Sequence, residues 1–575
     1  MKSIETKTSA CNGCTRCLRR CEVKAITLSD GFASINDDLC ILCGECISAC
    51  RRKARFYLSD LSKISAWLSA GQKIAVILDP SYIGAFPTIK GGQLITALRK
   101  AGFAFIHESS EAAAAITLQL TELARGDGIN NIITSNCPSI NKMIETYYPD
   151  LLDCLAPIAS PAVAEGRYLK QKYGKDTLVV SVSPCIARKD EAYAPENKGC
   201  IDGVLTFYEL FNLLNRHEVI PEECEESLPD NENTGINQFY STAGGIITAL
   251  RMQENFPYDR YMSFHISGIV NCKNVLGELR NGIYTNCVIE MNACPGGCVN
   301  GPLRPDGSSG YKNNLRIKSH TNRVSVSPEK VREFLSIAPI GQEYTDKTPS
   351  LPMPSEEEIK AMLVKIGRKS RSSELDCGAC GYRTCRENAI AICQGRSTHD
   401  RCIQYLHDKA SSLANLVMDA TPNMVMILDS ELTIQEFSES CSKCFHIPHD
   451  EAIGKQLVEL IDDTDYIWAL EKKTHLRNKI VELPDYDLVV QQNITYLKKE
   501  HGLLVILIDI TREHRREEEE YLKKLEIAEL AQKIIDKQMM SAQMIAGLLG
   551  ETTAETKVTL NKLCRSLLGE EGGDV

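Results

Sequence analysis

The chain has no long hydrophobic segment, no excess of positive charge and no secretory signal at its start. Its longest apolar runs, such as residues 503–508, are strand-length. They exclude a membrane span, because a spanning helix needs about 20 apolar residues. A net charge of −11 argues against a nucleic-acid-binding surface. Without a signal peptide we expect a cytoplasmic protein whose thiols stay reduced.

Cysteine, by contrast, is abundant, at 25 of 575 residues. In a small secreted protein this number would predict disulfides, but in a long cytoplasmic chain clustered cysteines indicate metal ligands. A chain of this length also exceeds what one hydrophobic core can organise. We therefore expect a multidomain α/β protein in which several segments bind iron–sulfur clusters.

Residues 1–57 contain two runs of four cysteines with identical spacing. This spacing lets three thiolates of each run bind one 4Fe-4S cube while the fourth reaches the other cube. The predicted ligand sets are Cys11, Cys14, Cys17 and Cys50 for the first cluster, and Cys40, Cys43, Cys46 and Cys21 for the second. The segment resembles a bacterial two-cluster ferredoxin, although Glu22 and Arg51 replace the proline that usually follows each run. A zinc ribbon is the alternative, but zinc modules pair two CxxC knuckles.

Residues 58–345 alternate strand-length apolar runs with helix-length amphipathic runs. This alternation predicts an α/β domain with a mainly parallel sheet. Cys137 and Cys185 each follow a predicted strand directly, where folds of this kind bind ligands.

Cys294 and Cys298 flank two glycines, which allow a tight turn and a close approach of the backbone to a cluster. Together with Cys137 and Cys185 they provide the four thiolates that one cube needs.

The segments around these four cysteines, in this order, resemble the three signature loops of the FeFe-hydrogenases. The resemblance implies a cube bound by Cys137, Cys185, Cys294 and Cys298. It also implies that Cys298 bridges to a diiron centre carrying carbon monoxide, cyanide and a dithiolate, which together with the cube forms the H-cluster. A structural zinc or iron–sulfur site in a non-catalytic relative is the alternative.

The resemblance also implies residues that surround the diiron centre. Pro80, Ser81, Ser160 and Pro161 match contacts to its ligands. Arg188 stands where the family has a lysine that binds the distal cyanide, and Lys189 is the alternative after a shift of one residue. Ser183 and Asn292 replace two pocket methionines, and Glu191 matches a retained glutamate.

The proton route of the efficient catalysts in this family is missing. Asn136 replaces the proton-delivering cysteine, and Ala156, Gln119 and Ile116 replace the serine and the two glutamates behind it. None of these side chains titrates. The substitutions therefore resemble the sensory branches of the family, and we expect low turnover.

Residues 346–408 are predicted to form a linker, a short helix and a small helical 4Fe-4S domain. The linker is proline-rich around residues 350–354. The cluster ligands would be Cys377, Cys380, Cys385 and Cys402, whose spacing is similar to the small cube module of membrane electron-transport complexes and corrinoid iron–sulfur proteins. Zinc is the alternative there.

Residues 409–513 resemble a PAS domain, a sensory module of α+β fold. A hairpin is predicted at residues 425–437, helices follow, and three more strands are expected within residues 486–510. Cys441 and Cys444 form either a redox or metal switch or an incidental pair. Residues 514–575 are predicted to form helices, with a second helix at residues 553–568, that dimerise or transmit a signal.

The sequence thus favours a hydrogen-sensing iron-only hydrogenase. Expected partners are H2 and protons, a redox protein such as ferredoxin, and a signalling kinase or phosphatase that contacts the PAS domain or the tail; we also expect a homodimer. Three further 4Fe-4S clusters would accompany the H-cluster. A metabolic ferredoxin-linked hydrogenase and a non-catalytic iron–sulfur electron carrier are the alternatives.

Overall fold

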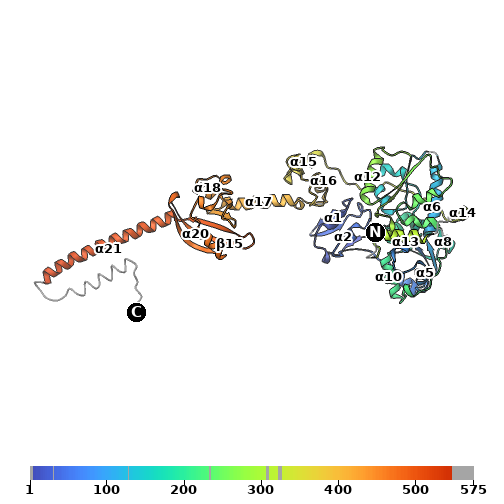
Figure 1. Ribbon diagram of the computed structural model, residues 1–575, viewed down its shortest axis with the longest axis horizontal. Coiled ribbons are helices and arrows are strands. Elements are labelled where there is room, and N and C mark those ends of the chain that lie inside the picture. The colour runs from blue at the N-terminus through green and yellow to red at the C-terminus, as the bar shows by residue number, and fades with distance from the viewer. Residues whose placement is uncertain are drawn as a thin grey trace. The chain divides into compact units, whose positions relative to one another are not determined.

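The computed structural model describes residues 4–29, 31–126, 128–231, 235–305, 310–321 and 327–546. The chain divides into two compact units, Met1–Tyr405 and Leu406–Val575, which are described separately here. Figure 1 labels many of their helices and the strand β15. Among the described helices, none combines the length and the apolar character that crossing a membrane requires.

The cysteine-rich N-terminal segment consists of two antiparallel strand pairs and two short helices. Strand β1 pairs with β4, and β2 pairs with β3. Each helix begins inside a cysteine run, directly after a residue with positive φ, so the chain reverses next to the thiols. The elements are β1 (Ile4–Thr6), α1 (Arg16–Arg20), β2 (Ile26–Ser29), β3 (Phe32–Ile35), α2 (Glu45–Ala49) and β4 (Arg55–Tyr57).

The next segment is an α/β assembly with two parallel sheets. The first sheet has the order β6-β5-β8-β9 and the second the order β10-β11-β7. The prediction of mainly parallel pairing is confirmed, and the division into two sheets was not expected. The strands are β5 (Ile74–Leu78), β6 (Phe105–Glu108), β7 (Asn131–Ile133), β8 (Leu178–Val182), β9 (Gly203–Leu205), β10 (Met262–Ser267) and β11 (Cys287–Asn292).

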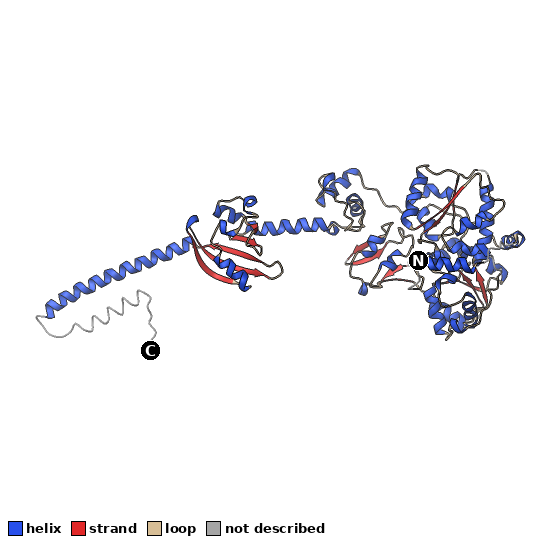
Figure 2. Cartoon of the chain, in the orientation of Figure 1, coloured by secondary structure: helices blue, strands red, loops and turns tan. Residues whose placement is uncertain are grey.

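Helices pack around both sheets, so strands such as β5 and β11 are buried along their whole length. Figure 2 shows this arrangement, with strands in red and helices in blue. The helices are α3 (Leu61–Ser69), α4 (Tyr82–Ala85), α5 (Gly91–Lys100), α6 (Ser110–Arg125), α7 (Pro138–Tyr147), α8 (Pro161–Lys172), α9 (Ala187–Tyr193), α10 (Phe207–Arg216), α11 (Gly245–Arg251), α12 (Ile269–Arg280), α13 (Gly310–His320) and α14 (Pro328–Ile337).

The third part of the first unit contains two helices, α15 (Glu356–Lys365) and α16 (Cys385–Cys393). The loop before α16 packs against the N-terminal segment: Lys24 Nζ donates to the carbonyl of Gly381 at 2.6 Å, and Arg383 pairs with Glu22 at 2.5 Å. A Cβ at Gly381 would lie 2.8 Å from the side chain of Leu18, so only glycine fits this contact. The residues around Cys380 therefore lie directly beside the N-terminal segment.

The second unit contains one antiparallel sheet with the order β13-β12-β16-β15-β14. Three strands were expected within residues 486–510, but only two lie there, because β14 precedes residue 486 and pairs with β15. The strands are β12 (Met424–Leu428), β13 (Ile434–Phe437), β14 (Leu476–Leu483), β15 (Leu488–Leu497) and β16 (Gly502–Asp509).

Helices complete this unit and extend past its predicted limits. The boundaries expected after residues 408 and 513 both fall inside helices, α17 (Ile403–Ala420) and α21 (Thr511–Ala546). The helix predicted at residues 553–568 lies outside the described residues. The other helices are α18 (Glu439–Phe445), which carries Cys441 and Cys444, α19 (His449–Ala452) and α20 (Thr464–Lys472).

Candidate metal centre

Four cysteines from three loops of the α/β assembly line one small cavity together with Cys43 of the N-terminal segment; we call it the cysteine cavity. Cys137 immediately precedes α7, Cys185 lies between β8 and α9, and Cys294 and Cys298 follow β11. All three loops start at the carboxyl ends of parallel strands, where such folds leave space for ligands. The structure therefore brings together the four thiols that the sequence predicts to bind one cube.

The turn between Cys294 and Cys298 depends on glycine. Gly297 has φ +97°, and a Cβ there would lie 2.6 Å from the backbone nitrogen of Ala243. Any other residue would force the backbone of this loop away from the neighbouring chain. The two glycines thus allow the turn that brings both thiols to the cysteine cavity.

A second cavity adjoins the first and shares Cys298 and Arg188 with it. We call it the polar cavity. Its lining comes from the ends of β5, β8 and α8 and from the 3-10 segment near residue 240. The lining residues are Ile77, Asp79, Pro80, Ser109, Asn136, Pro161, Ala162, Ser181, Ser183, Arg188, Tyr240, Ser241 and Cys298. Cys298 is therefore placed to contact groups in both cavities.

Arg188 carries the buried positive charge between the cavities. Its side chain is only 6% exposed; it pairs with Glu191 at 2.5 Å and donates to the carbonyl of Asn136 at 3.1 Å. Burial disfavours this charge, but Glu191 and the thiols Cys185 and Cys298 more than compensate, which raises the pKa of Arg188. A guanidinium held in this way can donate hydrogen bonds to an anionic ligand.

Four predicted pocket residues lie elsewhere than the resemblance implies, and one of them, Ser81, lines neither cavity. Lys189 lines neither cavity; its Nζ donates to the carbonyl of Val204 at 2.9 Å and pairs with Glu209 at 3.2 Å, so it does not substitute for Arg188. Asn292 lines the cysteine cavity instead of the polar cavity. Ser160 caps α8 by accepting from the backbone N–H of Val163, and its neighbour Pro161 lines the polar cavity.

Buried polar atoms without partners indicate what the cavities can hold. Within the described residues, the buried hydroxyl of Ser183, which lines the polar cavity, has no hydrogen-bond partner; nor has that of Ser81, which is buried outside both cavities. Such a group costs about 1–3 kcal/mol unless a ligand satisfies it. Burial also raises the pKa of Cys185 to about 11 and that of Cys294 well above its usual range. A cationic iron cluster would stabilise these thiolates, so the residues fit a cube with an adjoining group that accepts hydrogen bonds.

The N-terminal cysteines form two further groups. One cavity is lined by all four thiols predicted for the first cluster, Cys11, Cys14, Cys17 and Cys50. In the second group, burial and then the neighbouring Cys21, Cys46 and Cys40 raise the pKa of Cys43. Cys43 also lines the cysteine cavity. The second ferredoxin-type group therefore lies next to the candidate H-cluster site.

The cysteines of the third part also form a group. Burial raises the pKa of Cys380, and the neighbouring Cys402, Cys377 and Cys385 add to the shift. Arg368 directs a guanidinium nitrogen to Cys402 Sγ at 3.7 Å. Cys393, which is exposed at the end of α16, is not among these neighbours.

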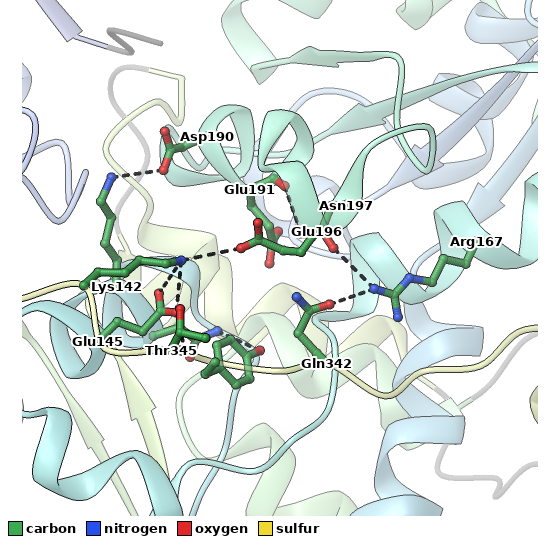
Figure 3. Close-up of polar contacts among 12 residues, drawn as sticks. Lys142, Glu145, Arg167, Asp190, Glu191, Glu196, Asn197, Gln342 and Thr345 are labelled. Carbon is green, nitrogen blue, oxygen red and sulfur yellow. Dashed lines mark hydrogen bonds and ion pairs between the residues drawn. The ribbon is translucent and has the colours of Figure 1, made fainter.

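An outer cleft is lined by charged residues, including Glu191, the partner of Arg188. Glu191 lines this cleft and not the polar cavity. Figure 3 shows the ion pair of Lys142 with Asp190, which measures 3.1 Å. Lys347 pairs with Glu145 at 3.0 Å. The two members of each pair carry opposite charges that balance, so these pairs give the cleft no strong preference for anions or cations.

Several residues of the site were not predicted from the sequence. Asp79 directly precedes Pro80 at the end of β5, a position that could have been noticed. Tyr240 and Ser241 belong to a 3-10 segment with no sequence signature. Glu290, fully buried on β11, accepts hydrogen bonds from three backbone N–H groups and from Asn292.

Comparisons with known proteins agree with this geometry. Residues 72–302 match the family described as iron only hydrogenase large subunit, C-terminal domain. Residues 33–56 match the 4Fe-4S binding domain family, and residues 374–404 match the FeS iron–sulfur cluster family.

Two curated proteins are similar to the chain. Iron hydrogenase 1 of Clostridium pasteurianum is 28% identical over 364 residues, which cover 46% of this chain and 63% of that protein. The NADP-reducing hydrogenase subunit HndD of Solidesulfovibrio fructosivorans is 26% identical, covering 51% of this chain and 63% of that subunit. The chain thus spans less than two thirds of these relatives.

A solved structure of the [FeFe]-hydrogenase HydA1 from Chlamydomonas reinhardtii aligns with 51% of this chain and with all of that chain, at 18% identity and a TM-score of 0.42.

Proposed function

We propose, from the premise that residues 72–302 belong to the iron-only hydrogenase large-subunit family, that this chain binds an H-cluster and reacts with hydrogen. The observation that carries the proposal is the position of Cys298, which lines both the cysteine cavity and the adjoining polar cavity. A thiolate there can bind a cube and a neighbouring metal group together. When bound, the diiron group would supply the iron site at which H2 splits heterolytically.

The residues of the chain would bind, orient and shield that group. The guanidinium of Arg188 and the hydroxyl of Ser183 are donors suited to cyanide or carbonyl ligands. Pro80 and Pro161 present apolar surface without an N–H group. The cavity is buried, which excludes bulk water from the reacting atoms.

Electrons would leave through the iron–sulfur clusters that these groups of cysteines would bind. Cys43 of the second ferredoxin-type group lines the cysteine cavity, which supports transfer between those two clusters. The loop of Cys380 packs on the same N-terminal segment through Gly381 and Lys24. We therefore propose that three further 4Fe-4S clusters connect the H-cluster to a redox partner such as ferredoxin.

We further propose that the protein senses hydrogen. Asn136 cannot transfer protons as a cysteine would, which supports slow turnover. The sheet order of the second unit, β13-β12-β16-β15-β14 with helices inserted after β13, supports a PAS-type domain. Helix α17 begins one residue after Cys402, so a predicted cluster ligand is covalently continuous with the helix that leads into this unit. Dimerisation and a kinase or phosphatase partner would follow from this role.

The exchange of H2 with D2O, followed by mass spectrometry on the matured full-length protein, tests the chemistry. The wild type should form HD, Cys298→Ala should not, and Cys154→Ser, which removes a thiol outside both cavities, should behave as the wild type. A rate high enough for metabolic flux would favour the alternative of a ferredoxin-linked metabolic hydrogenase. Absence of exchange in a protein that contains its cubes would favour an iron–sulfur electron carrier.

A further inference from the structure

Two side chains, those of Asn292 and Asn136, connect the buried carboxylate of Glu290 to the polar cavity. Asn292 Nδ2 donates to Glu290 Oε1 at 2.8 Å, and Asn136 Nδ2 donates to Asn292 Oδ1 at 3.4 Å. Asn136 lines the polar cavity. We call Glu290, Asn292 and Asn136 the polar triad. Two of its members come from β11 and the third from the loop after β7, its neighbour in the sheet.

The carboxylate of Glu290 fixes the direction of these hydrogen bonds. Oε1 accepts from the N–H of Gly244 at 2.8 Å as well as from Asn292, and Oε2 accepts from the N–H groups of Ile246 and Ile247 at 2.9 and 3.2 Å. Four donors therefore surround a group that, when ionised, can only accept. Asn292 must turn its NH2 toward Glu290, and its carbonyl oxygen then faces Asn136.

The same reasoning fixes the amide of Asn136. Its NH2 must face the carbonyl oxygen of Asn292, and its own oxygen accepts from the hydroxyl of Thr134 at 3.1 Å. Its backbone is held as well, because Arg188 donates to its carbonyl. The described residues supply one acceptor for Asn136 Nδ2, which leaves its second N–H for the polar cavity.

We propose that Glu290 and Asn292 are positioning residues that make Asn136 a hydrogen-bond donor toward the group bound in the polar cavity. This inference rests on the proposed function for the identity of that group. Glu290 does not touch the bound group, because Asn292 and Asn136 lie between them. It acts only by fixing the orientation of these two side-chain amides. The ligand atom that meets Asn136 must be an acceptor, such as a carbonyl or cyanide ligand or the unprotonated bridgehead amine of the dithiolate.

The substitution Glu290→Gln tests the proposal. A glutamine has one acceptor oxygen and one NH2 group, so its lowest-energy arrangement keeps the oxygen toward Ile246 and Ile247 and turns the NH2 toward Asn292. Asn292 and then Asn136 would rotate, and the polar cavity would lose its donor. In matured protein at pH 8, the carbon monoxide or cyanide infrared bands should shift by more than their width.

Two controls separate this effect from general damage. In the Asn292→Leu background the triad is already broken, so adding Glu290→Gln should leave the bands where Asn292→Leu alone places them. Glu209→Gln removes another buried carboxylate at a helix N-terminus, which pairs with Lys189 away from the polar cavity. It should lower the thermal midpoint and leave the bands unchanged. The proposal would be overturned if Glu290→Gln left the infrared bands unchanged. It would also be overturned if adding Glu290→Gln to the Asn292→Leu variant shifted the bands further.

A second measurement does not need the diiron group. In protein that carries its cubes only, the shifts in thermal midpoint caused by Glu290→Gln and Asn136→Ser should be non-additive, although these residues do not touch. The non-additivity should vanish in the Asn292→Leu background. Additive shifts would overturn the triad even if the infrared bands were present. Conversely, non-additive shifts in a protein without infrared bands would support the coupling within the triad and reject the proposed hydrogenase chemistry.

Discussion

Removing the guanidinium of Arg188 should destabilise the first unit strongly. In Arg188→Met, the carboxylate of Glu191 loses its partner at 2.5 Å while it stays only 11% exposed. Breaking one side of a buried ion pair costs about 3–5 kcal/mol, because the remaining charge stays desolvated. A segment as long as residues 58–345 has an entropy of unfolding of about 0.6 kcal/mol/K, so the thermal midpoint should fall by about 5–8 °C.

Calorimetry of the cube-loaded full-length protein would measure this shift. The transition of the second unit serves as an internal reference, and iron analysis of each variant separates loss of the ion pair from loss of clusters. The double variant Arg188→Met/Glu191→Gln should recover most of the stability, since neither charge remains. Lys142→Met is the matched control: its pair with Asp190, also on α9, is 25% and 35% exposed and should be worth less than about 1 kcal/mol. A single variant that shifts by less than about 2 °C, or a double variant that recovers nothing, would refute the reasoning.

Three other predictions follow from single contacts. Gly381→Ala, at φ +99° against the N-terminal segment, should increase hydrogen exchange of residues 374–404 more than Gly395→Ala, at φ +69° in open space, which has the backbone strain without the clash; equal exchange in the two variants would refute the packing argument. Cys14→Ser should reduce the iron content by about four atoms per chain, and Cys393→Ser should leave it unchanged. Burial raises the pKa of Glu165 to about 7 from its ordinary 4.5, so the folded protein retains a proton that the unfolded chain releases. The free energy of unfolding should therefore fall as pH rises from about 5 to 7, by at most about 1.4 kcal/mol per pH unit. Urea titrations should show a smaller slope in Glu165→Gln, and the remaining slope comes from Glu290, whose pKa burial also raises to about 7; an unchanged slope would contradict the assignment.

The cysteine groups could be predicted because ligand spacing is local. The runs that contain Cys11 and Cys40 encode their own turns, and the cysteines at the ends of β7, β8 and β11 are marked by the strands before them. Parallel strands then bring their carboxyl ends to one region without further information. The α/β class of residues 58–345 could also be predicted, because the alternation of strand-length and helix-length runs is a local pattern.

Contacts that depend on the third dimension could not be predicted. Arg188 and Lys189 are adjacent in sequence, but successive residues on a helix point about 100° apart, and only the packing of α9 decides that Arg188 faces the cavities. Asn136 and Asn292 were each interpreted separately as a substitution. Their side chains are hydrogen-bonded although 156 positions separate them in the chain. The strand β14 was missed because most of its side chains are exposed, so its sequence lacks the apolar alternation of a half-buried strand.

Infrared absorption in the carbon monoxide and cyanide stretching region tests the central claim most directly. The full-length protein would be reconstituted with iron–sulfur clusters, matured with the diiron group and measured under nitrogen and then under hydrogen. The account predicts bands under nitrogen that shift under hydrogen. A protein that contains its cubes by iron analysis but shows no such bands would contradict the account and would be an iron–sulfur electron carrier.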